Sequence, residues 1–249
     1  MIDGQAPVEV FDEIDSTILE ARRRAERGEL SPVWLIAKHQ TAGRGRRGRA
    51  WTSHGGNLMA TLLFTTDQPP QRIALLGFAT GVAIAETIDA IAGAGTAQLK
   101  WPNDVFIGGA KASGIMLDSG SIAPGRTWVA LAFGVNLADA PENIDQKTIC
   151  LREVLPPDAP APDPLGFLSA LRPKLQAWSA RIVSEGFEPL RRAWLQRAYG
   201  LGQEARVVQG EQTLEGRIAG LSGRGELELD TPSGRRLIAA GDVFLPKAA

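Results

Sequence analysis

"PVWLIAKHQTAGRGRRGRAW", residues 32–51, contains the clearest indication of how this chain folds. Its first part, 32–40, is a short apolar run of the kind found in buried β-strands. The run leads straight into a loop, 40–51, in which glycines and arginines alternate and which ends at Trp51. We therefore expect a core strand that is followed directly by a basic, glycine-rich loop.

On its residues alone, the loop 40–51 is open to three interpretations: a nucleic-acid patch, a phosphate cradle or a solvated basic turn. Its glycines are Gly43, Gly45 and Gly48, and its arginines are Arg44, Arg46, Arg47 and Arg49. Glycine lets the backbone approach a ligand closely, and arginine offers forked donors to phosphate or carboxylate. Trp51 is suited to stack on a purine. Charge repulsion and glycine entropy predict a loop without fixed structure until an anion binds. The loop matches neither a Walker nor a Rossmann fingerprint.

Bulk composition excludes several classes of protein. The chain has 249 residues, 44% of them apolar, and a formal net charge of −1, so it lacks the basic excess of a dedicated nucleic-acid binder. A single cysteine, Cys150, permits no disulfide within the chain and fits a reducing compartment. Because His39 and His54 are the only histidines, a Cys/His zinc site is excluded as well.

The sequence carries no sign of secretion or of membrane insertion. Residues 1–17, "MIDGQAPVEVFDEIDST", are acidic and mixed, whereas a signal peptide is basic and then apolar. The longest apolar run, 73–93, contains Glu86 and Asp89, which predicts a buried amphipathic helix. We expect a cytoplasmic protein without membrane contact.

The remaining pattern predicts strands and helices in succession. A strand at 8–14 precedes a helix that ends at Gly28. Ser16 or Thr17 is expected to cap this helix, with Glu20 as the partner in a capping box. Further strands are expected at 32–40, 57–64, 97–101, 103–109, 111–119 and 127–138, and further helices at 71–93, 165–185 and 187–198.

The pattern of residues changes in the last third of the chain. Residues 156–164, "PPDAPAPDP", are rich in proline and predict a loop. From about residue 201, short alternating runs are separated by turn signals such as "SGRG" and "PSGRR". This pattern predicts four or five short strands in a small β-barrel.

A second candidate site lies within "LKWPNDVFIGGAKASGIMLDSG", residues 99–120. Lys100 and Lys111 supply ammonium groups on neighbouring strands. Asn103 and Asp104 supply oxygen atoms at a turn that proline fixes. The set suits Mg²⁺ and a polyphosphate, because lysine neutralises charge while a carboxylate holds the metal or its water. The same "PND" is also compatible with a plain turn.

Five motifs, in this order along the chain, resemble those of the biotin protein ligases. They are "DST" at 15–17, "QTAGRGRRGRAW" at 40–51, "KWPND" at 100–104, "AK-x-x-GI" at 110–115 and "G-x-N" at 134–136. The resemblance covers roughly residues 8–246. It implies an α+β fold with a mixed-sheet catalytic domain of the biotin/lipoate ligase type, packed with helices, at 1–200. It also implies a small SH3-like β-barrel at 201–249.

The resemblance implies a reaction in two steps. The biotin carboxylate attacks the α-phosphate of ATP and gives biotinyl-5′-AMP and pyrophosphate, and a lysine of a biotin carboxyl-carrier domain then attacks this mixed anhydride. Cations and Mg²⁺ must screen the two anions, and a loop must exclude water from the adenylate. The chain begins almost at the first catalytic strand, so we expect a monofunctional ligase that binds no DNA. The resemblance also allows a homodimer that forms through sheet edges, but the sequence does not fix the oligomeric state.

The resemblance also assigns roles to residues. The biotin side is expected to comprise Ser16, Thr17, Gln40, Arg44, Gly45, Arg46, Arg47, Lys111, Gly114 and Ile115. The ATP side is expected to comprise Arg44, Arg47, Arg49, Trp51, Asn57, Lys100, Asn103 and Asn136, and the metal ligands Asn103 and Asp104. Lys111 and Arg46 are the expected catalytic cations, with Lys111 between the biotin carboxylate and the α-phosphate.

The sequence departs from the family pattern at two positions, and two other functions are compatible with parts of it. Ile18 stands where many relatives have asparagine, so a polar contact is lost there, and His54 receives no role. One rival is a lipoate- or octanoate-type ligase or acyltransferase with the same core, although no "RRxSGG" segment is present. The other is a nucleic-acid-binding protein, against which the near-neutral charge argues.

Overall fold

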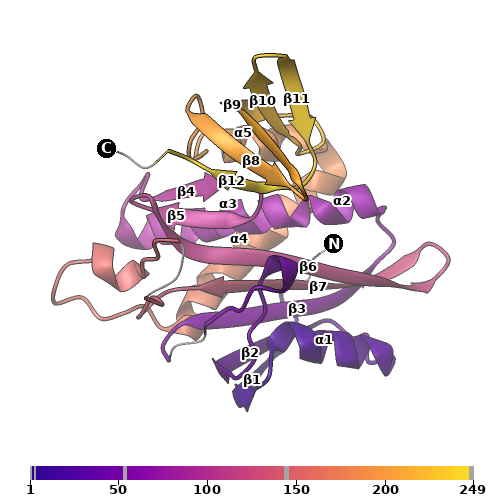
Figure 1. Ribbon diagram of the computed structural model, residues 1–249. Coiled ribbons are helices and arrows are strands. Elements are labelled where there is room, and N and C mark those ends of the chain that lie inside the picture. The colour runs from indigo at the N-terminus through magenta and orange to yellow at the C-terminus, as the bar shows by residue number, and fades with distance from the viewer. Residues whose placement is uncertain (1, 3, 53–54, 143–145, 247–249) are drawn as a thin grey trace.

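The computed structural model describes residues 2, 4–52, 55–142 and 146–246, so His54 lies outside the described residues. The chain forms a large mixed sheet flanked by helices and a smaller sheet from its C-terminal part, which stand next to each other in Figure 1. This arrangement confirms the α+β class predicted from the sequence. The division into domains near residue 200 stays a prediction.

The larger sheet has seven strands in the order β1-β2-β3-β7-β6-β5-β4. Its strands are β1 Val8–Ile14, β2 Val33–Gln40, β3 Leu58–Thr66, β4 Ala97–Lys100, β5 Asp104–Ile107, β6 Ala110–Ala123 and β7 Arg126–Val135. The first two pair in parallel and all other neighbours pair antiparallel. All seven predicted strands are therefore present, and β6 extends beyond its predicted end.

Helices cover both faces of this sheet. They are α1 Thr17–Glu26, α2 Pro70–Ala74, α3 Leu76–Ala92, α4 Pro164–Glu185 and α5 Glu188–Leu195, with short 3₁₀ turns at Arg46–Gly48 and Leu151–Val154. On one face α3 packs on β4, β5 and β6 and also contacts α4 and α5. On the other face α1 packs alone against β2, β3 and β7 (Figure 1). Each face has its own apolar cluster, and the α3 side holds the larger one.

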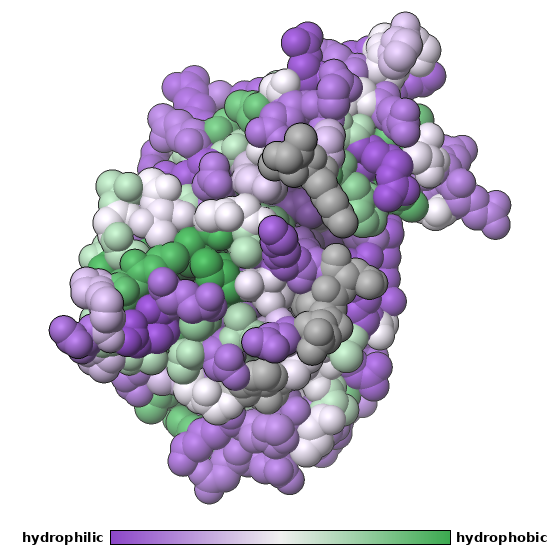
Figure 2. All heavy atoms as spheres, turned by 60° about the vertical axis from the view of Figure 1, so that its left-hand side comes forward, coloured by the Kyte–Doolittle hydropathy of each residue, from purple (hydrophilic) through white to green (hydrophobic). Residues whose placement is uncertain are grey.

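The apolar helix is part of the core, as the sequence predicted. The segment Pro70–Ala92 is long and apolar enough to cross a membrane by length and composition. Ten of the residues of α3 are buried, however, and it is packed between the sheet and two helices. Polar side chains cover most of the face drawn in Figure 2, and apolar ones gather only in small areas. The predicted single helix is divided at Leu75 into α2 and α3.

The start of α1 differs from its prediction. Ser16 occupies the N-cap position, but its side chain makes no capping hydrogen bond. Glu20 does not close a capping box, because its carboxylate instead accepts hydrogen bonds from Arg23 and Arg24. Two guanidinium groups within one helical turn are stronger partners for this carboxylate than a backbone N–H. Ile18 is 5% exposed and packs in the smaller apolar cluster, which explains an apolar residue at that position.

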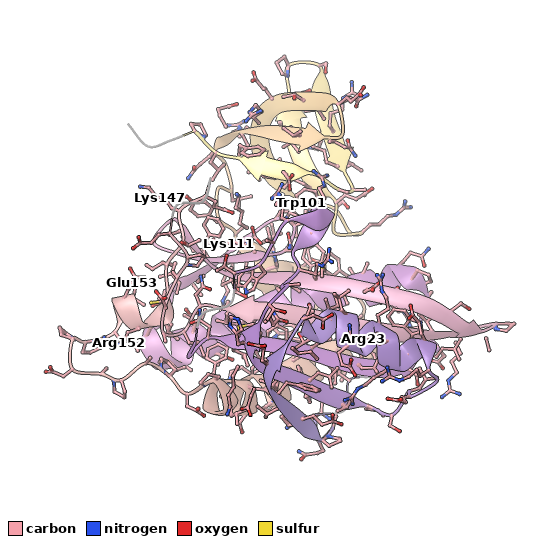
Figure 3. All side chains as sticks on the ribbon, turned by 60° about the horizontal axis from the view of Figure 1, so that its bottom comes forward. Arg23, Trp101, Lys111, Lys147, Arg152 and Glu153 are labelled. Atoms are coloured by element: carbon pink, nitrogen blue, oxygen red, sulfur yellow. The ribbon has the colours of Figure 1, made fainter. Side chains whose placement is uncertain are left out.

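The C-terminal part forms a five-stranded antiparallel sheet in the order β11-β10-β9-β8-β12. Its strands are β8 Glu204–Gln209, β9 Gln212–Leu221, β10 Leu227–Thr231, β11 Gly234–Ile238 and β12 Asp242–Phe244. The predicted short strands are therefore present. Among the described residues β11 and β12 do not pair, so the sheet is not a closed barrel. The indole N–H of Trp101 donates to the Gly225 carbonyl (3.1 Å) where the two sheets meet (Figure 3).

Candidate active site

The N-terminus of α1 carries a buried cluster of polar side chains. The backbone N–H and the hydroxyl of Thr17 both donate to Gln40 Oε1, at 2.8 and 3.1 Å. The Thr61 hydroxyl donates in turn to Thr17 Oγ1 at 2.8 Å. Ser16, next to this cluster, is buried as well. Because buried polar groups are kept only when they are hydrogen-bonded, these bonds fix the hydroxyls and the amide in place. Two predicted biotin contacts, Thr17 and Gln40, are thus brought together by α1 and β2.

Thr61 was not predicted, although the sequence contained a signal for it. It is a polar residue inside the apolar strand β3 and is completely buried. A hydroxyl in such a run needs a partner inside the core, and the partner is Thr17. The pattern of β3 alone does not reveal which distant residue that partner is.

A pair of glycines forms a flat floor beside this cluster. Gly114 of β6 lies directly opposite Gly134 of β7. The Trp51 ring lies against both, since a Cβ atom added at Gly134 would stand 2.4 Å from Trp51 Cε2. A Cβ atom added at Gly114 would stand 3.1 Å from Cζ3 of the same ring. The absence of side chains at these two positions therefore creates room for a planar group. Gly134 was missed as a site residue, although it begins the "G-x-N" motif.

Lys111 lies at the edge of this floor. Its Nζ is 2.7 Å from Asp104 Oδ1, and both side chains are largely buried. The same ammonium group lies 5.8 Å from the centroid of the Trp51 ring. The backbone N–H of Lys111 donates to the Lys147 carbonyl at 2.9 Å, so the segment that carries Lys147 lies next to the start of β6 (Figure 3). A cation at the edge of this floor is suited to bind an anion that enters next to it.

Lys100 is a second cation close to Asp104. The two residues are opposite each other in the pairing of β4 with β5. Burial lowers the pKa of the Lys100 ammonium below its ordinary value, while the Asp104 carboxylate offsets part of this effect. Lys100 Nζ also lies 5.1 Å from the centroid of the Phe106 ring. Lys100 therefore adds positive charge next to Asp104, and its contact with ATP stays a prediction.

The glycine–arginine loop folds back on itself. The Gly45 N–H donates to the Arg49 carbonyl (2.8 Å), and the Trp51 N–H donates to the Gly43 carbonyl (2.9 Å). Arg47 has φ 56° and ψ 33°, in the left-handed region. Such a conformation costs a non-glycine residue about 1–3 kcal/mol and needs support from its surroundings. The structure gives the loop one folded conformation, and its mobility without an anion stays a prediction.

The arginines of the loop point in different directions. Arg46 is half-buried, and its Nη1 donates to Asn103 Oδ1 at 2.9 Å. Burial lowers the pKa of the Arg46 guanidinium below its ordinary value. Arg47 and Arg49 instead donate to Asp242 Oδ2 at 2.7 and 2.5 Å. The Arg44 residue is exposed. Only Arg46 therefore joins the cluster formed by "KWPND".

The asparagines Asn103 and Asn136 form different hydrogen bonds. Asn103 Nδ2 donates to the Ile115 carbonyl at 2.7 Å, so that its side chain links β6 to Arg46. Asn136 is buried, and its Nδ2 donates to the Ile149 carbonyl at 3.3 Å. Its Oδ1 is buried and has no hydrogen-bond partner among the residues that the structure describes. An unused buried acceptor is costly, and it is available to a ligand here.

The side-chain amide of Asn57 forms hydrogen bonds with the backbone of residues 137–139. Its Oδ1 accepts hydrogen bonds from the backbone N–H groups of Leu137, Ala138 and Asp139, at 2.9 to 3.2 Å. Its Nδ2 donates to the Asp139 carbonyl at 2.8 Å. The side chain thus fixes the turn that follows β7 and Asn136. Its contact with ATP stays a prediction.

Replacing Asn57 with alanine is expected to lower the free energy of unfolding by about 3 kcal/mol, because three backbone N–H groups lose their acceptor. Asn57→Asp keeps an acceptor oxygen and should cost about 1 kcal/mol. Urea unfolding of both variants measures the difference. If Asn57 acts mainly on the nucleotide, both variants will keep wild-type stability and the KM for ATP will rise instead.

Part of the predicted set is therefore close together: Lys111 pairs with Asp104, Arg46 bonds to Asn103, and the Trp51 ring lies against Gly114, whereas Arg47 and Arg49 bond to Asp242. In the described part of the chain no three His, Cys, Asp or Glu side chains are grouped so that they could hold a metal ion. The predicted metal ligands Asn103 and Asp104 are bonded to Arg46 and Lys111. The site thus combines cations, a bare floor and a polar cluster, which suits an anion with a planar polar end.

Comparison with known proteins matches both parts of the chain. Residues 11–136 match the Biotin/lipoate A/B protein ligase family, and residues 200–245 match the Biotin protein ligase C terminal domain. A biotin–[acetyl-CoA-carboxylase] ligase from Paracoccus denitrificans is 37% identical over 233 residues, which are 92% of this chain and 97% of that protein. The enzyme of that name from Mycobacterium tuberculosis is 31% identical over 96% of this chain and 89% of its own length.

A solved structure supports the same relationship. The biotin protein ligase from Aquifex aeolicus in complex with biotin and ATP has a TM-score of 0.81 and 25% identity to this chain. The match covers 97% of this chain and 99% of that one. The chain belongs to the biotin/lipoate A/B protein ligase family.

Proposed function

We propose that this protein is an ATP-dependent biotin protein ligase. It joins the biotin carboxylate to the α-phosphate of ATP, which releases pyrophosphate, and then passes biotin from biotinyl-5′-AMP to a lysine of a carboxyl-carrier domain. The observation that carries the proposal is the convergence of Lys111 and Arg46 on one site that also contains the buried Thr17–Gln40 cluster. Relatives named as biotin–[acetyl-CoA-carboxylase] ligases support the same reaction.

In the first step two anions must approach each other. Lys111 is the cation between the carboxylate and the α-phosphate, and it leaves Asp104 for the negative charge that develops in the transition state. Arg46 is desolvated and held by Asn103, so that its guanidinium needs little reorganisation to bind the phosphate. The buried acceptor of Asn136 takes a donor from the ligand.

The polar and the apolar ends of biotin have matching surroundings. Thr17 and Gln40 offer a hydroxyl and an amide to the ureido ring, as the resemblance implies. The Gly114–Gly134 floor offers space for a flat body, and Trp51 lies on it in this structure. A ligand that uses the same floor displaces the indole, which then stacks on the nucleotide side of the ligand.

Mg²⁺ is the cofactor that the reaction implies. The protein offers one carboxylate, Asp104, with the amide oxygen of Asn103 beside it, and Mg²⁺ is commonly held by one or two carboxylates together with substrate phosphates. Asp104 would hold a metal that is shared with ATP once Lys111 leaves it, and a metal contact of Asn103 Oδ1, which accepts from Arg46 here, stays a prediction. When bound, Mg²⁺ neutralises charge on the polyphosphate.

The second step requires an apo carrier domain as protein substrate. The target lysine attacks the mixed anhydride only as a neutral amine, and AMP leaves with the proposed support of Arg46. A cytoplasmic location fits these substrates. The expected lack of DNA binding and the homodimer through sheet edges stay predictions.

Pyrophosphate release separates this function from its rivals. Purified protein with ATP and Mg²⁺ should release pyrophosphate when biotin is added, and excess lipoate or octanoate should not inhibit the release. Release that depends on lipoate and is indifferent to biotin would assign the chain to the other branch of the family. Salt-sensitive binding of a polynucleotide without any pyrophosphate release would favour the nucleic-acid-binding alternative.

A further inference from the structure

A carboxylate of the C-terminal sheet reaches the glycine–arginine loop. Asp242, the first residue of β12, accepts hydrogen bonds from Arg47 Nη1 and Arg49 Nη2 with one oxygen, Oδ2. Its side chain is 21% exposed, whereas those of Arg47 and Arg49 are 39% and 61% exposed. The shared carboxylate is therefore the more enclosed partner, and it connects two parts of the chain that are far apart in sequence.

The loop needs such an anchor. Its arginines, Arg44, Arg46, Arg47 and Arg49, carry four positive charges within six residues. Arg47 also holds a left-handed backbone conformation, with φ 56°. Repulsion and strain both favour an open loop. Asp242 opposes them, because it draws the two outward arginines to one point while Arg46 turns inward to Asn103.

The Asp242 carboxylate also acts electrostatically on the Arg46 guanidinium. Burial lowers the pKa of Arg46, and the Asp242 carboxylate is the strongest of the charges that raise this pKa. Its neighbours Arg47 and Arg49 lower this pKa further. One carboxylate thus offsets the repulsion that the outward arginines exert on the inward one.

We propose that Asp242 is a positioning residue for the reaction: from the C-terminal sheet it holds the glycine–arginine loop folded over the site and so directs Arg46 at the adenylate. The role of Arg46 in this statement rests on the proposed function, whereas the anchoring of the loop does not. The C-terminal sheet thereby takes part in retention of the intermediate without touching it.

Limited proteolysis tests the anchor in the protein without substrates. Asp242→Asn keeps the shape of the side chain and removes its charge, so trypsin should cut after the loop arginines about 3- to 10-fold faster than in the wild type. The difference should shrink at high salt, because exposed ion pairs are screened. Mass spectrometry identifies cuts within residues 44–49. Equal rates of loop cleavage in both proteins would overturn the proposal.

A matched control separates the anchor from a general loss of charge in the C-terminal sheet. Asp230 of β10 is also bound by an arginine, Arg235, at 2.7 and 3.1 Å, and this pair is exposed. Asp230→Asn should leave cleavage of the loop at the wild-type rate. Acceleration by both variants would mean that the whole sheet is loosened, and it would refute a specific role for Asp242.

The retention of the intermediate tests the link to catalysis. In Asp242→Asn, biotinyl-adenylate should dissociate about 3- to 10-fold faster, while the rate of adenylation at saturating ATP changes less. Asp242→Glu keeps the charge and should restore most of the retention. Wild-type retention in Asp242→Asn would contradict the proposal. A wild-type protein that makes no adenylate would refute the proposed function, yet the proteolysis would still decide whether Asp242 anchors the loop.

Discussion

Replacing Lys111 with alanine is expected to slow formation of biotinyl-adenylate by about 10²–10³-fold, the usual cost of losing one charge contact in a transition state. Lys111 Nζ stands beside the bare floor and pairs with Asp104, so that it is the cation best placed between two reacting anions. Pyrophosphate release in single-turnover experiments measures the effect. The KM for biotin should change much less than kcat, because the contact strengthens only as charge develops.

A neighbouring lysine supplies the control. Lys147 is exposed and touches Lys111 through its backbone carbonyl, so Lys147→Ala removes a nearby positive charge without removing that hydrogen bond. It should adenylate biotin at nearly the wild-type rate. A loss in Lys147→Ala as large as that in Lys111→Ala would show that general positive charge drives the step. Near-normal adenylation by Lys111→Ala would transfer the catalytic role to another residue.

Replacing Arg46 with alanine is expected to release biotinyl-adenylate about 10- to 100-fold faster, since a hydrogen bond to a charged group contributes about 1.5–3 kcal/mol. Arg46 is the loop arginine that turns inward, and Asn103 holds it there. The escaped anhydride should then label lysines of a bystander protein. A chase with unlabelled biotin measures the release, and mass spectrometry of the added bystander measures the labelling.

Arg192→Ala is the matched control for this second prediction. Arg192 lies on α5, is paired with Glu188 at 2.9 Å and is 73% exposed. Its loss changes the net charge by the same amount and should leave both release and labelling as in the wild type. Unchanged release in Arg46→Ala would mean that the loop does not retain the intermediate through this residue.

Local patterns predicted the elements and the motifs because the information for them is local. The apolar run that ends at Gln40 forms β2, and the apolar segment with Glu86 and Asp89 forms a buried helix. The resemblance, and no local pattern, assigned Lys111 and Trp51 to one site; the structure places the Lys111 ammonium 5.8 Å from the Trp51 ring centroid, and their roles toward the substrates stay predictions. Periodicity and turn signals suffice to predict the strands and helices.

The predictions failed where several groups compete for one side chain and where the partner lies far away in the sequence. Glu20 has the spacing of a capping box, but Arg23 and Arg24 compete for its carboxylate and win. No local pattern indicates that Asp242 binds Arg47, which lies 195 positions away in the sequence. Closure of the C-terminal strands into a barrel likewise depends on pairing between β11 and β12, which no short pattern specifies. In each case the outcome is set by which groups the fold brings together.

Transfer of biotin to a carrier lysine is the complete reaction that the proposed function requires. Purified protein is mixed with ATP, Mg²⁺, biotin and an apo biotin carboxyl-carrier domain, with a carrier variant whose target lysine is replaced by arginine as control. Mass spectrometry of the intact carrier should show the addition of one biotinyl group, only with ATP and only on the intact target lysine. A carrier that stays unmodified while a known biotin ligase modifies it under the same conditions would contradict the account.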